Sequence, residues 1–325
     1  MPTRSATGPD ESREGVSFSH LDESLFEGAG ATKRHLVDYL DAVSERIIPA
    51  LRDRPLSVIR VTGGQAPFMQ KNVPKYTPDW VATIPLYAHA SKRTVSYALC
   101  NDRRTLLWFA NQRAIEYHPT LALAGDLGHA THLVLDLDPP TADSFAMAVH
   151  AAHLVRQALA DVGLSGAVKT SGAKGVHVFV PVDGTADAEQ TAAATRAVAR
   201  RAELLDPAAA TTQFVKTDRG NKVFVDATRA GGATVAAVYS PRARPGLPVS
   251  FPVAWADLDN VSPSDFTIHN ATDILASGDP WADALPPAQR LPPELIAEGM
   301  EIPLGRVAAM HEGKRRKQAA RKHAE

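Results

Sequence analysis

The chain has 325 residues, a hydrophobic fraction of 44% and a formal net charge of -1. This composition excludes a wholly disordered chain, because a protein of this size buries most of its apolar surface in a core. The balanced charge also excludes a protein that coats nucleic acid indiscriminately, so a polyanionic partner would have to bind a local basic patch.

The sequence contains one cysteine, Cys100, which excludes an intrachain disulfide and an all-cysteine metal site. The N-terminus lacks the apolar core of a signal peptide, and no segment has the run of about 18 apolar residues that a membrane helix needs. We therefore expect a cytoplasmic protein with no membrane partner.

Residues 1–16 are rich in Pro, Ser, Gly and charge, and we expect them to form a flexible lead. Apolar residues at three- and four-residue steps predict a helix from Thr32 to Ile48, and further helices over about 102–115, 143–162 and 187–205. Short apolar runs predict strands at 57–61, 95–99, 132–137, 168–171, 176–182, 223–226 and 233–239.

These elements predict a fold that mixes helices and strands. No change in composition divides the core, so we expect one large domain over residues 17–305, with a Pro-rich arm from about 280 to 305. Residues 306–325 are predicted to form a basic, solvated tail.

Two acidic residues follow a short apolar strand in the segment HLVLDLDPP. Asp136 and Asp138, two residues apart, project from the same face near the end of this strand. Neighbouring carboxylates repel, and a divalent cation between them stabilises both charges. A third carboxylate, Asp226, ends the apolar run VFVD and would complete a two-metal site. The alternative is an ordinary strand end at which an aspartate caps the next helix.

The segment KTSGAKGVHVFVPV places a glycine-rich turn between two strand-like runs. Gly172 and Gly175 allow a tight turn whose backbone N–H groups can face an anion. Ser171 and Lys174 add a hydroxyl and a cation, and His177 enters the next strand. This pattern predicts a phosphate-binding hairpin and differs from a Walker loop in its spacing. The alternative is an ordinary glycine hairpin with a surface lysine.

Three motifs occur in one order: LDLDPP, TSGAKGVHVFVP and VFVDATRAGGATVAAVYSPRARPG. Together they resemble the primase-polymerase domain of bacterial DNA ligase D, within the archaeo-eukaryotic primase superfamily, and the similarity extends from about Leu21 to Trp255. The resemblance implies an α+β fold in which mixed and antiparallel sheets flanked by helices form a primase-like catalytic core over residues 17–305. The sequence contains no ligase K-x-D-G core, which favours a stand-alone member of the family.

The resemblance also implies roles for individual residues. Asp136, Asp138 and Asp226 match the family's catalytic aspartates, which bind two divalent cations, Mn²⁺ or Mg²⁺. The implied nucleotide-binding residues are Ser171, Lys174, His177, His118, Arg242 and Arg229. The implied DNA-binding residues are Lys33, Phe68, Met69 and Lys71.

Three positions depart from the family pattern. Met69 replaces the second of two aromatic residues near the templating base pair, which weakens base stacking. Glu23 stands where the family has a lysine that binds the 5′-phosphate of a downstream strand, a role for which Lys33 is retained. Arg229 replaces a polar amide after the third aspartate, which predicts an altered contact with nucleotide or primer.

These residues predict a template-directed DNA/RNA nucleotidyl transferase that extends primers, fills short gaps or processes broken DNA ends by a two-metal mechanism, as in end joining. The expected partners are a primer-template, a gap or a double-strand-break end, NTP or dNTP, a DNA ligase and an end-binding protein. Two alternatives stay open: a non-catalytic module that bridges DNA ends, and a haloacid-dehalogenase-like phosphohydrolase whose nucleophile is the first Asp of the D-x-D pair.

Overall fold

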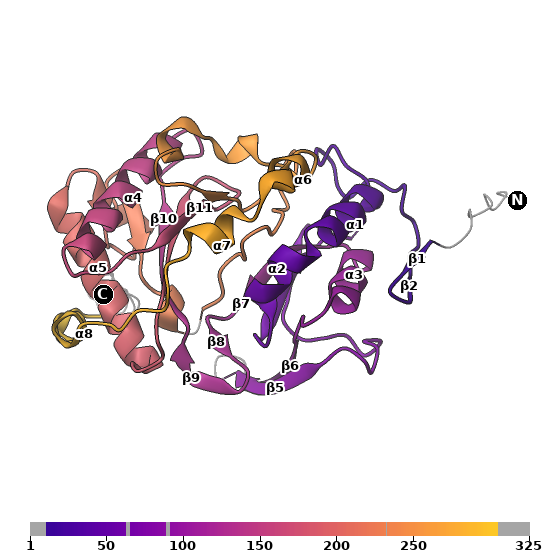
Figure 1. Cartoon of the computed structure of the whole chain (residues 1–325), viewed down its shortest axis with the longest axis horizontal. Coiled ribbons are helices and arrows are strands. Elements are labelled where there is room, and N and C mark those ends of the chain that lie inside the picture. Colours follow the sequence, from indigo (N-terminus) through magenta and orange to yellow (C-terminus); the bar gives the residue numbers. More distant parts are fainter. Residues whose placement is uncertain (1–10, 63–65, 89–91, 232, 305–325) are drawn as a thin grey trace, which may run out of the picture. The chain divides into compact units, whose positions relative to one another are not determined.

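The computed structural model describes residues 11–62, 66–88, 92–231 and 233–304. The chain divides into two compact units, coloured by sequence in Figure 1. Unit 1 comprises Met1–Thr120, Thr234–Phe251 and Pro263–Asp279. Unit 2 comprises Leu121–Ala233, Pro252–Ser262 and Pro280–Glu325. Each unit is assembled from separate stretches of the chain, so no single linker in the sequence marks the division.

Three helices of unit 1 pack against one another: α1 (Lys33–Ala42), α2 (Ser44–Leu51) and α3 (Arg103–Asn111) (Figure 1). The single helix predicted from Thr32 is in fact two, with a break at Val43. The helix predicted over 102–115 begins where expected, because the Asp102 side chain accepts a hydrogen bond from the backbone N–H of Thr105 at 2.7 Å. It ends earlier than predicted, because Arg113 has a left-handed backbone with φ of 58° and the chain then enters a strand.

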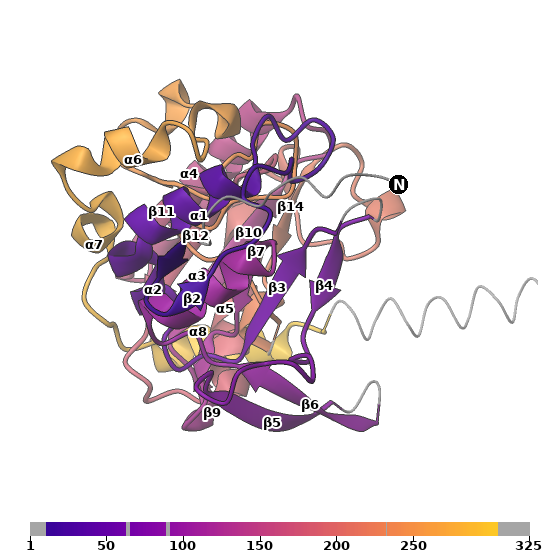
Figure 2. The ribbon, with the colours of Figure 1, turned by 90° about the vertical axis from the view of Figure 1, so that its right-hand side faces the viewer.

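The main sheet of unit 1 has the strand order β4-β3-β6-β5, and β7 also pairs with β3 (Figure 2). These strands are β3 (Leu56–Arg60), β4 (Phe68–Gln70), β5 (Thr83–Ala88), β6 (Arg93–Ala98) and β7 (Ala114–Pro119). The strand predicted over 233–239 is wrong. The N–H of Ala237 does donate to the carbonyl of Tyr117 at 2.9 Å, but Tyr239 has φ of 63° and turns the chain before a regular ladder forms.

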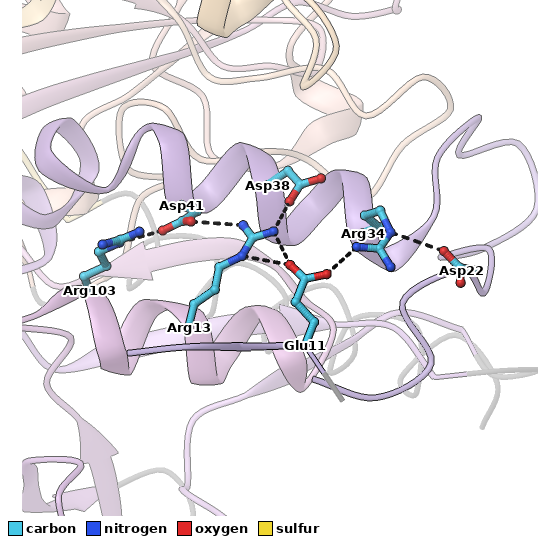
Figure 3. Close-up of polar contacts among 7 residues, drawn as sticks. All are labelled: Glu11, Arg13, Asp22, Arg34, Asp38, Asp41 and Arg103. Atoms are coloured by element: carbon cyan, nitrogen blue, oxygen red, sulfur yellow. Dashed lines mark hydrogen bonds and ion pairs between the residues drawn. The ribbon is translucent and has the colours of Figure 1, made fainter. Parts of the chain in front are cut away.

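The start of the described chain is a short hairpin of β1 (Ser12–Arg13) and β2 (Val16–Ser17). The prediction of a flexible lead is therefore wrong for residues 11–16, while residues 1–10 lie outside the described residues. Arg13 fastens the hairpin, because its Nη2 lies 2.6 Å from Asp38 Oδ1 and its Nη1 lies 3.0 Å from Asp41 Oδ2 on α1. Figure 3 shows the whole set, which we call the N-terminal ion-pair network: Glu11, Arg13, Asp22, Arg34, Asp38, Asp41 and Arg103.

The main sheet of unit 2 has the order β13-β14-β10-β12-β11-β15. These strands are β10 (His132–Asp138), β11 (Ala167–Thr170), β12 (Val176–Pro181), β13 (Ala210–Thr211), β14 (Val223–Asp226) and β15 (Pro252–Val253). The β13 and β14 pair is parallel and the other pairs are antiparallel, which confirms the predicted mixed and antiparallel α+β class.

Helices α4 (Phe145–Ala160) and α5 (Ala188–Leu205) pack against each other and against β10. Along β10, Leu133, Leu135 and Leu137 are fully buried. Side chains alternate between the two faces of a strand, so Asp136 and Asp138 lie on the opposite face from these leucines. The Asp138 side chain is 40% exposed, whereas those of Asp136 and Asp226 are 19% and 10% exposed, so this face is open chiefly at Asp138.

The predicted Pro-rich arm contains two helices, α7 (Pro280–Ala284) and α8 (Pro293–Glu301). Helix α8 packs closely on α5, since a Cβ atom at Gly299 would lie 1.8 Å from the carbonyl oxygen of Ala193. Unit 2 also contains the small hairpin of β8 (Ala122–Leu123) and β9 (Asp126–Ala130), and unit 1 contains the short helix α6 (Ala271–Ile274). The predicted basic tail, residues 306–325, lies outside the described residues. Among the described helices, none combines the length and apolar character needed to cross a bilayer.

Candidate active site

The strand register of unit 2 brings the three predicted aspartates to one face of the sheet. Asp136 on β10 is the Cα partner of Asp226 on β14 and of His177 on β12. Side chains of directly paired residues point to the same face, and Asp138 shares this face because it follows Asp136 by two residues. We call Asp136, Asp138 and Asp226 the carboxylate cluster.

Asp138 meets two cations. Lys174 Nζ lies 2.9 Å from Asp138 Oδ1 and donates to the carbonyl oxygen of Pro139 at 2.5 Å. Arg219 Nη1 lies 3.6 Å from Asp138 Oδ2, and its guanidinium stands over the Phe224 ring at 3.8 Å from the centroid. The sequence predicts Lys174 at this site but gives no sign of Arg219, which lies in an irregular polar segment without a motif.

His177 is oriented by a buried lysine. Lys169 Nζ lies 2.8 Å from His177 Nδ1, within hydrogen-bond distance, and so fixes the orientation of the ring. Nε2 in turn lies 3.3 Å from Asp136 Oδ1. Lys169 is fully buried. Its position is set by the pairing of β11 with β12, which makes Lys169 the Cα partner of His177 and which no local sequence signal reveals.

Asp136 and Asp226 are held in position by hydrogen bonds and ion pairs. Burial tends to raise the pKa of Asp136, but His177 and Arg229 outweigh it and hold that pKa well below its ordinary value. Asp226 Oδ1 accepts from the backbone N–H of Thr228 at 2.8 Å and from its hydroxyl at 2.7 Å. Both carboxylates are therefore fixed in place.

Arg229 lies against the carboxylates. Its Nη2 is 2.7 Å from Asp136 Oδ2 and 3.1 Å from Asp226 Oδ2. The sequence predicts that this residue contacts nucleotide or primer, whereas the structure shows its guanidinium bound between two of the catalytic candidates.

The glycine turn uses its backbone differently from the prediction. Ser171 Oγ accepts from the N–H groups of Ala173 and Gly175 at 3.2 and 3.1 Å, so these two groups are bonded within the turn. The expectation that they face an anion is therefore wrong. Gly175 is required for space, because a Cβ atom there would lie 2.2 Å from the carbonyl oxygen of Leu137. The cation that the turn presents to the carboxylate cluster is Lys174.

The carboxylate cluster has the oxygen donors that Mg²⁺ and Mn²⁺ prefer, on two adjacent strands. Its donor chemistry thus fits a divalent cation. In the described part of the chain, no three His, Cys, Asp or Glu side chains converge as a ligand set. At the cluster, the nitrogen of Arg229 lies between the oxygens of Asp136 and Asp226 that a shared cation would use.

In unit 1, His118 and Arg242 converge on one glutamate that the sequence analysis missed. Glu116 Oε2 lies 2.8 Å from His118 Nε2 and accepts from Arg242 Nε at 3.0 Å. Burial tends to raise the pKa of Glu116, but His118 and Arg242 lower it to about 2. Glu116 and His118 are two apart on β7 and share a face, so the alternation E-x-H was an available signal.

Lys33 lies in unit 1 and is buried. Its Nζ donates to the carbonyl oxygen of Ser19 and to Asn111 Oδ1, both at 2.6 Å. Burial lowers the pKa of Lys33 to about 8, and the nearby charge of Arg113 acts in the same direction. Lys33 lines an open pocket of about 290 Å³ together with Arg113 and Glu23. Glu23 accepts from Arg113 Nη1 at 3.0 Å, so its charge is paired within the unit.

The remaining predicted DNA contacts are on the surface of unit 1. Phe68 is 38% exposed and Met69 is 46% exposed, while Lys71 is also exposed. The Arg60 guanidinium stands 5.9 Å from the centroid of the Phe68 ring. An exposed aromatic side chain beside a cation matches the composition of surfaces that stack nucleic-acid bases.

A family model described as the LigD primase-polymerase domain matches residues 32–281. The chain belongs to this family. It is 32% identical over 274 residues to the bifunctional non-homologous end joining protein LigD of Bacillus subtilis, which covers 82% of this chain and 44% of that protein. It is 34% identical over 260 residues to the multifunctional non-homologous end joining DNA repair protein LigD of Mycobacterium tuberculosis, which covers 77% of this chain and 34% of that protein. The chain thus spans less than half the length of these relatives.

A solved structure, the polymerase domain from Mycobacterium tuberculosis ligase D in complex with DNA, matches this LigD-type domain with a TM-score of 0.75 and 32% sequence identity. The match covers 84% of this chain and 98% of that chain. These findings confirm the resemblance inferred from the three motifs, the primase-like fold and the class of nucleotidyltransferase.

Proposed function

We propose that this LigD-type primase-polymerase domain adds nucleotides to primers at gaps or broken DNA ends under the direction of a template. The observation that carries the proposal is the strand register that places Asp136, Asp138 and Asp226 on one face of the unit 2 sheet, beside Lys174 and His177. The matching structure from Mycobacterium tuberculosis was determined with DNA, which supports a nucleic-acid substrate here.

The carboxylate cluster would hold two divalent cations, Mn²⁺ or Mg²⁺, which lower the pKa of a primer 3′-hydroxyl and stabilise charge on the transferred phosphate. Lys174 lies beside Asp138 and supplies a cation to the triphosphate. His177 keeps its Nε2 beside Asp136, because Lys169 holds the ring in this orientation through Nδ1. Ser171 keeps the turn closed so that Lys174 stays in position.

Within unit 1, His118 and Arg242 are proposed to bind nucleotide phosphate groups. Glu116 holds both side chains, so the orientation of one depends on the other. Arginine is suited to phosphate oxygens because its planar donors match them in pairs. A change at Glu116 would therefore disturb both proposed nucleotide contacts at once.

We infer that DNA is met by two parts of unit 1. Lys33 lines the pocket that would receive the 5′-phosphate of a downstream strand, while Phe68, Met69 and Lys71 would meet the primer-template. The relatives are named for non-homologous end joining, and we propose the same pathway for this chain, with a DNA ligase and an end-binding protein as partners.

The test is primer extension with Mn²⁺ on gapped, overhanging and unprimed templates, each supplied with NTPs or dNTPs. We expect templated addition at gaps and ends by the wild type and none by Asp136→Asn. Asp259→Asn is the matched control, because Asp259 is an exposed aspartate of unit 2 that pairs with His153. Tight DNA binding without any addition would instead support an end-binding module, and addition by Asp136→Asn would contradict the proposed site.

A further inference from the structure

One nitrogen of Arg229 contacts two members of the carboxylate cluster. Nη2 lies 2.7 Å from Asp136 Oδ2 and 3.1 Å from Asp226 Oδ2. These two aspartates are direct Cα partners on β10 and β14. A divalent cation that joined the two strands through these carboxylates would bind the same two oxygens.

The other oxygens of both aspartates are already engaged. Asp226 Oδ1 accepts two hydrogen bonds from Thr228, and Asp136 Oδ1 faces His177 Nε2. Magnesium binds oxygen ligands at about 2.0–2.1 Å, whereas a hydrogen-bonded nitrogen stays about 2.7–3.2 Å away. The Arg229 nitrogen and a divalent cation therefore cannot occupy the space between the two Oδ2 atoms at the same time.

Arg229 is attracted by two negative charges, but only one of its nitrogens contacts the carboxylates. Burial tends to lower the pKa of Arg229, but the charges of Asp136 and Asp226 outweigh it and raise that pKa. The contact to each carboxylate uses the same Nη2, and Nε is buried with no hydrogen-bond partner among the described residues. Paired, two-nitrogen contacts hold an arginine more firmly, and a buried unpaired donor is unfavourable. Such a guanidinium neutralises the aspartates yet can be displaced.

We propose that Arg229 is a resident counter-ion of the carboxylate cluster, which a divalent cation must displace in order to bind between Asp136 and Asp226. Arg229 thereby sets the metal concentration at which the cluster is occupied. The inference rests on the proposed metal-binding function and concerns a step that precedes chemistry. Without metal, Arg229 balances the charge that the paired strands bring together.

The test is Mn²⁺ binding, measured without nucleotide or DNA by the electron paramagnetic resonance signal of free Mn²⁺. Arg229→Gln should bind Mn²⁺ about tenfold more tightly than the wild type, because the competing cation is gone. Arg219→Gln is the matched control, since it removes the same charge from a side chain that lies against Asp138. The control should tighten binding less than about threefold. Arg229→Lys, which keeps the charge, should stay near the wild type.

A second readout is thermal unfolding. Without metal, Arg229→Gln should melt at a lower temperature than the wild type, because Asp136 and Asp226 then repel without a counter-ion, and Mn²⁺ should raise its melting temperature by more than it raises that of the wild type. If Arg229→Gln and Arg219→Gln tightened Mn²⁺ binding equally, the change in net charge alone would explain the effect, and the proposal would be overturned. Unchanged or weaker Mn²⁺ binding by Arg229→Gln would overturn it too.

Asp136→Asn separates this proposal from the one on which it rests. If Asp136→Asn weakens Mn²⁺ binding while Arg229→Gln leaves it unchanged, the metal site stands and the counter-ion role falls. If Asp136→Asn leaves Mn²⁺ binding unchanged, the cluster is not the metal site and both proposals fail.

Discussion

The carboxylate cluster of unit 2 and the N-terminal ion-pair network of unit 1 are built from the same kinds of side chain and differ in how they are held. In the network, the Asp38 side chain is 48% exposed and pairs with Arg13 across the surface of α1. In the cluster, the Asp226 side chain is 10% exposed and lies opposite Asp136 on an adjacent strand. Exposed ion pairs contribute little individually, whereas like charges forced together in a buried place need a compensating cation.

The two sets of charged residues differ in role: the cluster serves function and the network serves structure. The network joins each acid to an arginine and fastens a hairpin to a helix (Figure 3). The cluster places three acids on one face because the backbone pairs their strands, and neighbouring cations balance them. We therefore expect changes in the cluster to alter chemistry and changes in the network to alter stability.

The largest expected effect is that of Asp226→Ala. It should lower kcat for primer extension at least about a thousandfold, equivalent to about 4 kcal/mol of transition-state stabilisation, because a metal ligand is lost. Asp41→Ala, which removes an acid from the network, should change kcat less than about twofold. Steady-state kinetics of both variants measures the two values of kcat. Similar losses of kcat in both would contradict the separate roles of the cluster and the network.

The next largest effect is expected on stability, at the close approach of Gly175 to the backbone of Leu137. Gly175→Ala should lower the free energy of unfolding by about 1–3 kcal/mol, because the new methyl group would meet the carbonyl oxygen of Leu137. Gly125→Ala is its control, since a Cβ atom there has no neighbour within 4 Å. Urea unfolding of both variants measures the difference. A Gly175→Ala protein as stable as its control would show that the turn does not depend on this close approach.

Lys174→Ala should act on nucleotide binding. We expect it to raise the KM for the nucleotide about tenfold while kcat changes less, because the lysine would bind the triphosphate in both ground and transition states. Nucleotide titrations with a saturating primer-template separate the two constants. Equal effects on kcat and KM would assign Lys174 a different role within the cluster.

The network should respond in stability and in salt dependence. Arg13→Ala should cost about 1 kcal/mol of unfolding free energy at low salt and less at high salt, because partly exposed ion pairs are screened. Primer extension by this variant should match the wild type at a temperature where both are folded. A loss of activity in folded Arg13→Ala protein would give the network a functional role.

Lys33 is a buried cation of unit 1 whose charge should depend on pH. Its pKa of about 8 means that the ammonium charge is present below about pH 8 and lost above it. The preference for a 5′-phosphorylated downstream strand should therefore fall several-fold between pH 7 and pH 9, because one charge-assisted contact is lost. Lys33→Arg stays charged and should keep its preference over this range. Gap filling at a series of pH values measures it, and a pH-independent wild type would remove Lys33 from phosphate binding.

The sequence revealed those parts of the site that lie within one continuous segment. Asp136 and Asp138 end an apolar strand, Lys174 lies in the glycine turn and His177 in the strand that follows it, so local pattern was enough to predict them. The roles of Lys169, Arg219 and Glu116 depend on pairing between distant strands or on irregular segments. Lys169 looks like an ordinary strand residue until the register places it opposite His177.

The errors in fold prediction also have local causes. The predicted helix from Thr32 breaks at Val43, and the strand expected over 233–239 is lost to the left-handed backbone of Tyr239. Residues 11–15 are polar or glycine, which favours disorder by composition, yet Arg13 fastens this segment to acids on α1. Long-range ion pairs of this kind are invisible to composition.

The most direct test of the central claim, that the carboxylate cluster carries out nucleotidyl transfer, is a single-turnover reaction on a primed DNA end with Mn²⁺ and one nucleotide. Extended primer and released pyrophosphate are measured in the same samples for the wild type and Asp138→Asn. We predict equal amounts of the two products with the wild type and neither with the variant. Extension by Asp138→Asn at the wild-type rate, or no pyrophosphate from the wild type, would contradict the claim.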